Sequence, residues 1–495
     1  MKITQEQFAR LTLEEAGRLV AAAELSALDL VEASAARMDL FEPAINAVVT
    51  RTDEVSRRRA AESAASPGAG GALRGIPVAV KDNLMTRGVR TTCGSRILEN
   101  FIPPYDASAV AALQNAGAVV MGKTNMDEVA MGSSGEHSAY GPTGNPWDPG
   151  RITGGSSSGS AALVAYGGAL AALGSDTGGS IRQPAAFCGL VGMKPTYGRV
   201  SRYGLGALAS SLDQIGPLTR NARDNALLLD VISGRDPRDS TSAAGAETAA
   251  PCLPGIEEGV KGLRIVYDPA MLEGDGLSPV MAGGVRRAMN IAAGHGARIA
   301  EAAVPLIKYG VAAYYIICSC EASANLARFD GVRYGRRCGG GDVWDVYSET
   351  RGRGFGDEVK RRIMVGAYAL SQGYYDAYYL KAARVRRKLS QEFARLFLDA
   401  DILLLPVAPQ FPRRIGAKAG VMEDYLGDIF TLAANLAGLP AISFPIGVFD
   451  GLPTGVQAVA GPFAENILYR LARTIEKNTR LVGAPWTLAG PKEAK

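Results

Sequence analysis

Hydrophobic residues recur along the first part of the chain with the spacing of amphipathic helices. The segment Thr12–Glu15 has the sequence of a capping box, in which a threonine and a glutamate satisfy free N–H groups at the start of a helix. An apolar face continues through Leu19 and Ala23, and residues 26–41 repeat the pattern. We therefore predict an N-terminal helical segment, residues 1–65, packed on the rest of the protein.

From residue 76 onward, short apolar runs alternate with segments of helical periodicity. The apolar runs have the length of strands and are Ile76–Val80, Ala118–Gly122, Ala169–Gly174, Leu190–Met193, Leu263–Tyr267, Ile402–Pro406, Ala441–Pro445 and Val456–Val459. The helical segments between them include Ala107–Ala116, Ser158–Tyr166 and Ser278–Gly294. Strands that are apolar on both faces belong in a sheet that helices cover on both sides. The pattern predicts an α/β fold in which one sheet threads the whole chain.

Two later regions depart from this alternation. Residues 236–259 are rich in proline, glycine, serine and alanine, a composition that predicts a loop or the boundary of an insertion. The region near 305–400 is mainly helical in pattern and rich in tyrosine, so we expect a helical insertion there. No repeat of fixed period accompanies either region.

The composition is that of a globular protein and argues against several functions. The 495-residue chain is 47% hydrophobic and 21% charged, and its 53 basic and 49 acidic residues leave a net charge of +4. Such a balanced charge does not indicate nucleic-acid binding by the chain itself. Its start lacks a basic region followed by an apolar run, so we expect no signal peptide. The longest apolar stretch of small residues, Ala161–Leu173, is too short to span a bilayer, so we expect no membrane segment.

The cysteines and histidines are few and scattered. The six cysteines form no C-x-x-C pair, and there are only two histidines. A zinc site is therefore not expected, and reduced thiols in a cytoplasmic protein are the simplest interpretation. We expect no metal and no cofactor in this chain. His137 and His295 are interpreted as structural, because neither has a plausible set of catalytic partners.

A glycine- and serine-rich stretch contains the candidate nucleophile, Ser180. Two glycines precede this serine, so the backbone can turn sharply there. The backbone amides that can converge on one oxygen, as an oxyanion hole, are those of Thr177, Gly178, Gly179 and Ser180. Loss of one such donor typically costs about 2.7–4 kcal/mol. The competing interpretations are a glycine-rich turn before a helix and a phosphate cradle, although this stretch lacks the G-x-x-x-x-G-K-[ST] motif.

Lys81 is the candidate base. It ends an apolar strand, and burial lowers the pKa of an amine because it disfavours the charged form. A neutral amine is a competent base near pH 7. The alternative is that Lys81 simply pairs with an acid such as Asp82 or Asp127.

A second serine, Ser156, offers a bridge between nucleophile and base. A hydroxyl both donates and accepts a hydrogen bond, so Ser156 can pass a proton from Ser180 to Lys81. The three residues would then form a Ser-Ser-Lys relay that requires no histidine. The alternative role of Ser156 is the N-cap of the helix that begins near Ser158.

These motifs together resemble the amidase signature family. The family pattern of a strand-borne lysine, Gly-Gly-Ser-Ser and Asp-x-Gly-Gly-Ser is matched in order and spacing by Lys81, Gly154–Ser157 and Asp176–Ser180. The resemblance covers nearly the full length, and other matching segments are Lys123–Glu128, Met131–Ser134, Asn145–Asp148, Pro195–Arg202, Ser323–Gly331, Val359–Met364, Gly373–Tyr379 and Asn435–Pro440. It implies an amidase-signature domain over residues 66–495, with a large mixed central sheet that helices cover on both faces.

The resemblance also implies roles for individual residues. Ser180 resembles the acyl-accepting nucleophile, Ser156 the bridging serine preceded by a cis peptide bond, and Lys81 the base. The implied substrate is glutamine, whose amine needs an anionic partner and whose carboxylate suits the fork of an arginine. The residues that resemble its ligands are Asp428 for the amine, Arg361 or the adjacent Arg362 for the carboxylate, and Tyr314 or the adjacent Tyr315 as a further contact.

The resemblance is strongest to family members that hydrolyse glutamine for tRNA-dependent amidation. It implies that ammonia passes to a second, partner protein, which uses ATP and Mg²⁺ to convert Glu-tRNA(Gln) to Gln-tRNA(Gln), Asp-tRNA(Asn) to Asn-tRNA(Asn), or both. A third, small partner is also implied. We expect tRNA to be bound mainly by the ATP-using partner, since this chain shows no ATP loop and no marked basic patch. The alternatives are a stand-alone amidase for another small amide and a non-catalytic scaffold that docks tRNA or stabilises a partner.

Overall fold

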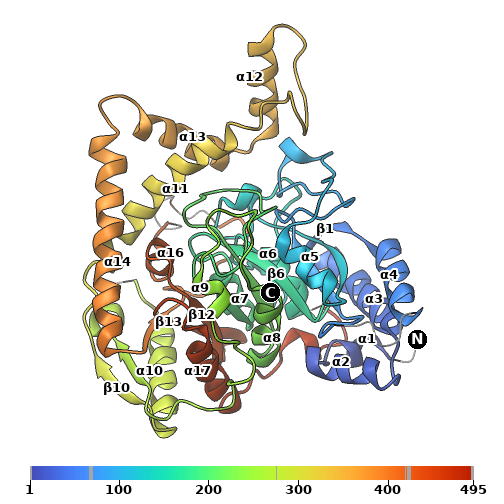
Figure 1. The fold of residues 1–495 in the computed structure, drawn as a ribbon, viewed down its shortest axis with the longest axis vertical. Coiled ribbons are helices and arrows are strands. Elements are labelled where there is room, and N and C mark those ends of the chain that lie inside the picture. The colour runs from blue at the N-terminus through green and yellow to red at the C-terminus, as the bar shows by residue number, and fades with distance from the viewer. Residues whose placement is uncertain (1–2, 66–70, 275, 418–419, 421–424, 492–495) are drawn as a thin grey trace.

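A large mixed sheet runs through the centre of the molecule (Figure 1). The structure is a computed structural model that describes residues 3–65, 71–274, 276–417, 420 and 425–491. Within these residues the 11 strands of the sheet are β1 (Val48–Arg51), β2 (Pro77–Lys81), β3 (Val119–Thr124), β6 (Ala171–Asp176), β7 (Val191–Lys194), β8 (Gln214–Thr219), β9 (Arg264–Tyr267), β10 (Arg298–Glu301), β11 (Ile402–Pro406), β12 (Ala441–Phe449) and β13 (Leu452–Ala460). A separate hairpin joins β4 (Gly144–Asn145) to β5 (Asp148–Ile152).

The strand order brings distant parts of the sequence together. It is β1-β3-β2-β6-β8-β7-β12-β13-β11-β9-β10, so β7 from the first half of the chain pairs with β12 from the last fifth. The pairs β2–β3, β2–β6, β9–β11 and β9–β10 are parallel, and the remaining pairs are antiparallel. One sheet therefore threads the chain from β1 to β13, as the apolar pattern predicts.

Helices form the layers on either side of the sheet. Their bounds are α1 (Gln5–Phe8), α2 (Leu13–Ala21), α3 (Ala27–Ile45), α4 (Asp53–Ala65), α5 (Ser108–Asn115), α6 (Ser158–Ala165), α7 (Arg182–Cys188), α8 (Ala222–Ile232), α9 (Gly245–Thr248), α10 (Pro279–Gly294), α11 (Gly310–Leu326), α12 (Val343–Gly354), α13 (Asp357–Leu370), α14 (Lys381–Asp399), α16 (Leu432–Leu436) and α17 (Glu465–Lys477). A π-helical segment, Asp376–Leu380, leads into α14. Among the described residues, none of these helices combines the length and the apolar character needed to cross a membrane.

Alternate residues of each strand enter different core layers, because successive side chains of a strand point to opposite faces. In β2, Val78 and Val80 pack in the layer that contains α5, α8, α10 and α17, whereas Ala79 packs with α6 and α7. In β11, Leu404 enters the first layer and Leu403 enters a layer formed by α11, α14 and α16. Helices thus cover both faces of a mixed sheet, which confirms the predicted fold class.

The N-terminal part of the chain contains more than the helices predicted for it. The capping box at Thr12 is present, with its hydroxyl accepting the N–H of Glu15 and the Glu15 carboxylate accepting the N–H of Thr12. The segment predicted as helical, residues 1–65, also contains a strand, since β1 forms the edge of the sheet and pairs with β3. The four-residue apolar-polar pattern of β1 is too short to be distinguished from a helix end by periodicity.

Residues 310–399 are largely helical, as their pattern predicts. Figure 1 shows α11, α13 and α14 along one side of the molecule, with α12 projecting beyond the rest. The helix α14 packs on α11, and both contribute to the core layer of β11. The strands β8 and β10 lie outside the predicted apolar runs, because β8 contains glycine and proline and β10 has a charged residue at each end.

Candidate active site

The buried amine of Lys81 lies at the centre of a cluster of hydroxyl groups. Lys81 is the last residue of β2, and the alternation along that strand turns its side chain to the same face as Ala79, toward α6. Its Nζ lies 2.8 Å from Ser156 Oγ, 2.9 Å from Ser157 Oγ and 3.0 Å from Ser175 Oγ. A further contact at 3.3 Å joins Nζ to the backbone oxygen of Ser175.

Lys81 is not part of an ion pair with the acids that the sequence offers as alternatives. Within the described residues, Asp82 pairs instead with Lys123 of the neighbouring strand, at 3.8 Å. The Asp127 carboxylate accepts the backbone N–H groups of Gly135 and His137, at 3.0 and 2.9 Å. The surroundings of the Lys81 amine are therefore mainly neutral hydroxyl groups.

Burial lowers the pKa of Lys81 to about 7, because desolvation disfavours the ammonium form. Asp127, Asp176 and Asp213 act in the opposite direction through their charge, without offsetting the effect of burial. Burial also raises the pKa of Asp213 to about 6, while the hydroxyl of Thr177, 2.7 Å away, favours its charged form. Near pH 7 a large share of Lys81 is accordingly a neutral amine.

Ser156 lies in the loop that precedes α6. The peptide bond between Gly155 and Ser156 is cis. Ser156 does not cap α6, because the N-cap position is held by Ser157, whose side chain makes no capping bond. The Ser157 hydroxyl instead donates to the backbone oxygen of Ser175, at 3.1 Å, and contacts Lys81.

Position 155 has no room for a side chain. A Cβ atom at this position would lie 2.0 Å from the carboxylate Oδ2 of Asp127 and 2.9 Å from the backbone nitrogen of Gly135. The same carboxylate accepts backbone N–H groups of the loop that follows β3, at Gly135 and His137. The backbone N–H of Asp127 donates to the backbone oxygen of Ser156 at 3.3 Å, so Asp127 also contacts the Ser156 loop directly. Only glycine allows this close approach.

Ser180 lies in the tight turn between β6 and α7 and is 7% exposed. Gly179 has a φ of +137°, and a Cβ there would meet Thr431 Oγ1 at 2.5 Å. The Ser157 N–H donates to the backbone oxygen of Ser180 at 3.1 Å, which joins the two serine loops. Within the described part of the chain, no hydrogen bond joins the Ser180 hydroxyl to Ser156. The structure thus brings Lys81 and Ser156 into direct contact and places Ser180 on the adjoining loop.

One of the four amides suggested for an oxyanion hole is already engaged. The N–H of Gly179 donates to Asp176 Oδ1 at 2.8 Å, and the N–H of Ile181 donates to Asp176 Oδ2 at 3.2 Å. Gly179 would contribute to an oxyanion hole only by sharing its hydrogen. The amides of Thr177, Gly178 and Ser180 are therefore the better candidates for the oxyanion hole.

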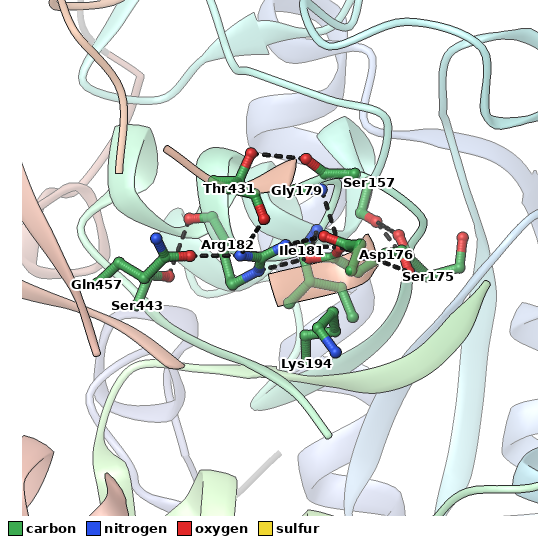
Figure 2. A network of polar contacts seen from close by, with 12 residues as sticks. Ser157, Ser175, Asp176, Gly179, Ile181, Arg182, Lys194, Thr431, Ser443 and Gln457 are labelled. Atoms are coloured by element: carbon green, nitrogen blue, oxygen red, sulfur yellow. Dashed lines mark hydrogen bonds and ion pairs between the residues drawn. The ribbon is translucent and has the colours of Figure 1, made fainter. Parts of the chain in front are cut away.

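Arg182 anchors the nucleophile turn to the C-terminal part of the chain (Figure 2). Its guanidinium donates twice to Asp176, from Nε and Nη2, at 3.0 Å each. It also donates to the backbone oxygen of Thr431 at 3.0 Å and to the side chain of Gln457. Burial alone would raise the pKa of Asp176, but the charge and hydrogen bonds of Arg182 outweigh it and hold that pKa below its usual range. The carboxylate is therefore a fixed, charged support for the turn.

The expected substrate ligands lie close to this turn, but they differ in burial. Tyr314 is buried, and its hydroxyl lies against Gly178, where an added Cβ would meet it at 2.7 Å. The hydroxyl of Tyr315 donates to Asp428 Oδ2 at 3.1 Å. Tyr314, Tyr315 and Asp428 thus converge on the side of the turn that carries Gly178.

The two adjacent arginines of α13 differ in burial. Arg362 is buried and donates to Glu358 at 2.7 Å, with its guanidinium 5.1 Å from the ring centroid of Tyr315. Arg361 also pairs with Glu358, but its side chain is 45% exposed. Both line a cavity of about 140 Å³ together with Ser133, Tyr315 and other residues. Burial against Tyr315 makes Arg362 the more constrained of the pair, while both reach the cavity.

Several polar residues of the site are not identified by the sequence motifs. Ser157 and Ser175 contact Lys81 directly, and Asn83 Nδ2 donates to Ser175 Oγ at 2.9 Å. Gln183 contacts Asp428. Ser157 and Asn83 stand within or next to the recognised motifs, so the sequence could have suggested them. Their contacts with Lys81 and Ser175 depend, however, on the pairing of β2 with β6.

The two histidines make their contacts outside the hydroxyl cluster around Lys81. His295 lies at the C-terminal end of α10 and contacts Asn478. His137 bonds through its backbone to Asp127 and Glu128, and it lines the cavity that contains Arg361. Among the described residues, neither histidine side chain forms a hydrogen bond with Lys81, Ser156 or Ser180. The candidate base in this site is an amine.

A buried amine in contact with one serine, with a second serine on the adjoining glycine turn, is the arrangement of a hydrolase that uses a serine nucleophile. A family model for Amidase matches residues 29–469, and the chain belongs to the amidase family. The A subunit of glutamyl-tRNA(Gln) amidotransferase from Carboxydothermus hydrogenoformans is 52% identical over 476 residues, which cover 95% of this chain and 97% of that protein. The protein of the same name from Rubrobacter xylanophilus is 51% identical over 475 residues, with coverages of 95% and 98%.

Solved structures show the same fold. The crystal structure of the A subunit of glutamyl-tRNA(Gln) amidotransferase from Thermotoga maritima aligns with a TM-score of 0.81 at 43% sequence identity, covering 99% of this chain and 98% of that chain. A peptide amidase in complex with chymostatin aligns with a TM-score of 0.84 at 28% identity, covering 97% and 99%. The architecture is therefore common to family members of different stated activity, and specificity must reside in side chains.

Proposed function

We propose that this chain is the glutamine-hydrolysing component, the A subunit, of a tRNA-dependent amidotransferase, and that it uses a Ser-Ser-Lys mechanism. Relatives of about half identity over nearly the full length carry the name of that component of glutamyl-tRNA(Gln) amidotransferase. The observation that carries the catalytic part is the 2.8 Å contact between the buried Lys81 amine and Ser156. A buried amine with a pKa of about 7 supports the role of base near neutral pH.

The hydroxyl cluster matches the hydrogen-bonding capacity of a neutral amine. Such an amine has two N–H groups and one lone pair. Ser157 donates its own proton to the backbone oxygen of Ser175 and so accepts from Lys81. Ser175 accepts from Asn83 and can accept the second N–H of Lys81. The lone pair then remains for the proton of Ser156, which is the direction that general-base catalysis requires.

The proposed reaction proceeds through an acyl-enzyme. Ser180 Oγ attacks the side-chain amide carbon of glutamine as its proton moves to Ser156, whose own proton moves to Lys81. Backbone amides of the turn at residues 177–180 stabilise the oxyanion. The C–N bond then breaks, and the proton returns along the same path to the leaving nitrogen, which departs as ammonia. Water, deprotonated by the same relay, hydrolyses the glutamyl ester of Ser180 and releases glutamate.

In this proposal each charged group on the α-carbon of glutamine has its own partner. The carboxylate of Asp428 binds the α-ammonium group, and Arg361 or Arg362 binds the α-carboxylate. Tyr314 or Tyr315 contacts the substrate between them. Burial against the nucleophile turn favours Tyr314 for that contact, because its hydroxyl lies against Gly178.

Partners and location complete the proposal. The chain works with the B and C subunits of the amidotransferase in a heterotrimer, in the cytoplasm, and ammonia passes to the B subunit. ATP and Mg²⁺ are used in that partner, which also binds most of the tRNA. The product is Gln-tRNA(Gln), Asn-tRNA(Asn) or both. The catalytic domain spans residues 66–495, with a helical insertion near 305–400, and residues 1–65 pack on it.

The test is replacement of the nucleophile. Ser180→Ala should reduce glutamine-dependent ammonia release to background while leaving the thermal unfolding transition in place. Ser348→Ala is a matched control, because the Ser348 hydroxyl is exposed and bonds within its own helix, to the oxygen of Trp344 at 2.7 Å. An electrophilic glutamine analogue should label Ser180 and no other residue. Wild-type activity in the Ser180→Ala variant would remove Ser180 from this role.

The stand-alone amidase alternative is separated by dependence on partners. Glutaminase activity measured with and without the B subunit and charged tRNA should rise when both are added. Equal activity for simple amides in their absence would favour the alternative.

A further inference from the structure

We infer that Gln183 is a positioning residue that holds the Asp428 carboxylate for the α-ammonium group of the substrate and ties it to the loop of Ser156. The inference rests on the proposed glutaminase function and adds a specificity-determining residue to it. Gln183 is 4% exposed and is the second residue of α7, which starts directly after the nucleophile turn.

The side-chain amide of Gln183 spans two parts of the site. Its Nε2 donates to Asp428 Oδ1 at 3.2 Å, and its Oε1 accepts the backbone N–H of Gly155 at 3.4 Å. Gly155 directly precedes Ser156, the residue in contact with Lys81. One neutral side chain therefore connects the group proposed to bind substrate with the loop proposed to relay the proton.

The chemistry of the two partners fixes the orientation of this amide. An ionised carboxylate only accepts hydrogen bonds, and a backbone N–H only donates them. The Gln183 amide has one face of each kind, so it satisfies both partners in a single orientation. A carboxylate in its place would repel Asp428, and an apolar side chain would satisfy neither partner.

Each oxygen of Asp428 accepts a hydrogen bond from a neutral donor. Gln183 donates to Oδ1, and the hydroxyl of Tyr315 donates to Oδ2. Neither donor carries a charge, so these two contacts orient the carboxylate without cancelling its negative charge. Gln183 and Tyr315 therefore fix the direction in which the Asp428 carboxylate faces.

The segment of Asp428 is also attached to the nucleophile turn through its backbone. The Thr431 hydroxyl lies 3.0 Å from the backbone oxygen of Asp428 and 2.6 Å from that of Gly178. The position of the carboxylate relative to Ser180 is thus set by the backbone, whereas its rotation is set by Gln183 and Tyr315. Removing Gln183 should weaken substrate binding more than it slows chemistry.

The cavity beside Gln183 supplies a matched control. Gln183 and Gln410 both line a cavity of about 140 Å³ that also contains Ser133 and Gly427. Gln410 is exposed, and its amide donates to the backbone oxygen of Gly276. The two glutamines therefore share a residue type and a cavity, but the Gln410 amide bonds away from Asp428.

The experiment is a double-mutant cycle on the full-length chain in its complex with the partner subunits. The variants are Gln183→Met, Asp428→Asn, the double variant and the control Gln410→Met. KM and kcat are measured for L-glutamine. The labelling rate of Ser180 by a fluorophosphonate, which has no ammonium group, is measured by intact mass. This labelling reports on the catalytic residues alone, because the reagent does not use the residues proposed to bind the α-ammonium group of glutamine.

Gln183→Met should raise KM about 10-fold to 100-fold, the effect of losing a hydrogen bond to a charged group. We expect kcat and the labelling rate to change less than about 3-fold, and the Gln410→Met control to match the wild type. Because Gln183 acts through Asp428, the double variant should be no worse than Asp428→Asn alone. If Gln183→Met does not fold, Gln183→Asn replaces it, since its shorter amide cannot span both partners.

Three results would overturn the inference. They are an unchanged KM in the Gln183 variants, a labelling rate that falls in parallel with glutamine hydrolysis, and KM effects that multiply in the double variant. A wild-type chain that labels at Ser180 but does not hydrolyse glutamine would instead refute the proposed function, and the inference with it.

Discussion

At the scale of single residues, the base of the site is surrounded mainly by neutral hydroxyl groups. Three serine hydroxyls lie within 3.0 Å of the Lys81 amine, and the nearest described acids bond elsewhere. Hydroxyl groups solvate an amine without imposing a permanent opposite charge, so desolvation dominates and the pKa of Lys81 falls to about 7. The neutral form is thereby available without a histidine.

The first prediction concerns pH. If Lys81 is the base, kcat/KM for glutamine should rise as pH increases from about 6 to about 8, with a midpoint at about 7, because only the deprotonated amine accepts a proton. The sign follows from a pKa that burial has lowered: below the midpoint the folded protein holds the ammonium form. Initial rates of ammonia release across this range provide the measurement. A flat profile, or one that falls with pH, would contradict the assignment of Lys81.

Sequence reasoning can find the chemical groups of the site but not all of their neighbours. Lys81, Ser156 and Ser180 stand in recognisable motifs, and the structure joins the first two directly. The contact of Ser175 with Lys81 cannot be read from the sequence, because it arises from the lateral pairing of β2 with β6. Such a contact depends on strand register, and register is not encoded in the local pattern of either strand.

At the scale of elements, the turn between β6 and α7 is held by several buried hydrogen bonds and an ion pair. Asp176 at the end of β6 receives two hydrogen bonds from Arg182 and two from backbone amides within the turn (Figure 2). The turn therefore closes on an internal ion pair in which both partners are fully buried. Its conformation is set before any substrate arrives, which suits a group that must stabilise developing charge.

The second prediction concerns this ion pair. Arg182→Met should destabilise the protein by about 3–5 kcal/mol, because it leaves the Asp176 carboxylate buried without its partner. Urea unfolding measures the change. The matched control is Arg18→Met, since Arg18 pairs with Glu24 on the surface and exposed pairs contribute only about 0–1 kcal/mol. Equal effects of the two substitutions would show that Asp176 does not depend on Arg182.

Periodicity predicts the types of most elements well, and their boundaries and partners less well. The helix expected at Ser158–Tyr166 is observed as α6, Ser158–Ala165, and the strand expected at Ile76–Val80 is observed as β2, Pro77–Lys81. The strand β8 is not predicted, although it lies between β6 and β7 in the sheet. Its sequence, Gln214–Thr219, contains glycine and proline, which usually indicate a turn rather than a central strand.

At the scale of the whole molecule, the N-terminal segment is continuous with the central core. The strand β1 pairs with β3, and Phe41 of α3 stacks on Tyr166 with ring centroids 4.9 Å apart. The buried guanidinium of Arg37 donates to the backbone oxygen of Tyr166 at 2.8 Å. These contacts connect α3 to the end of α6, the helix that begins directly after the Ser156 loop.

The third prediction is that the chain without residues 1–52 does not retain the native core. Its removal deletes β1 and exposes Tyr166 and the apolar side chains that pack against α3 in the same cluster. The expected results are loss of soluble expression or a thermal midpoint lower by more than about 10 °C, on the order of the effect of several kcal/mol in a protein of this size. The full-length chain is the control. A truncated protein with an unchanged midpoint would show that the segment is an independent appendage.

The partners of Arg182 also determine when this enzyme can first become competent during its synthesis. Thr431 follows Arg182 by 249 residues and Gln457 follows it by 275, so both leave the ribosome long after the nucleophile turn has emerged. Until then the nascent chain holds Asp176 and Arg182 without the C-terminal strands that enclose them. A ribosome-bound intermediate that ends before residue 431 should therefore have no glutamine-hydrolysing capacity.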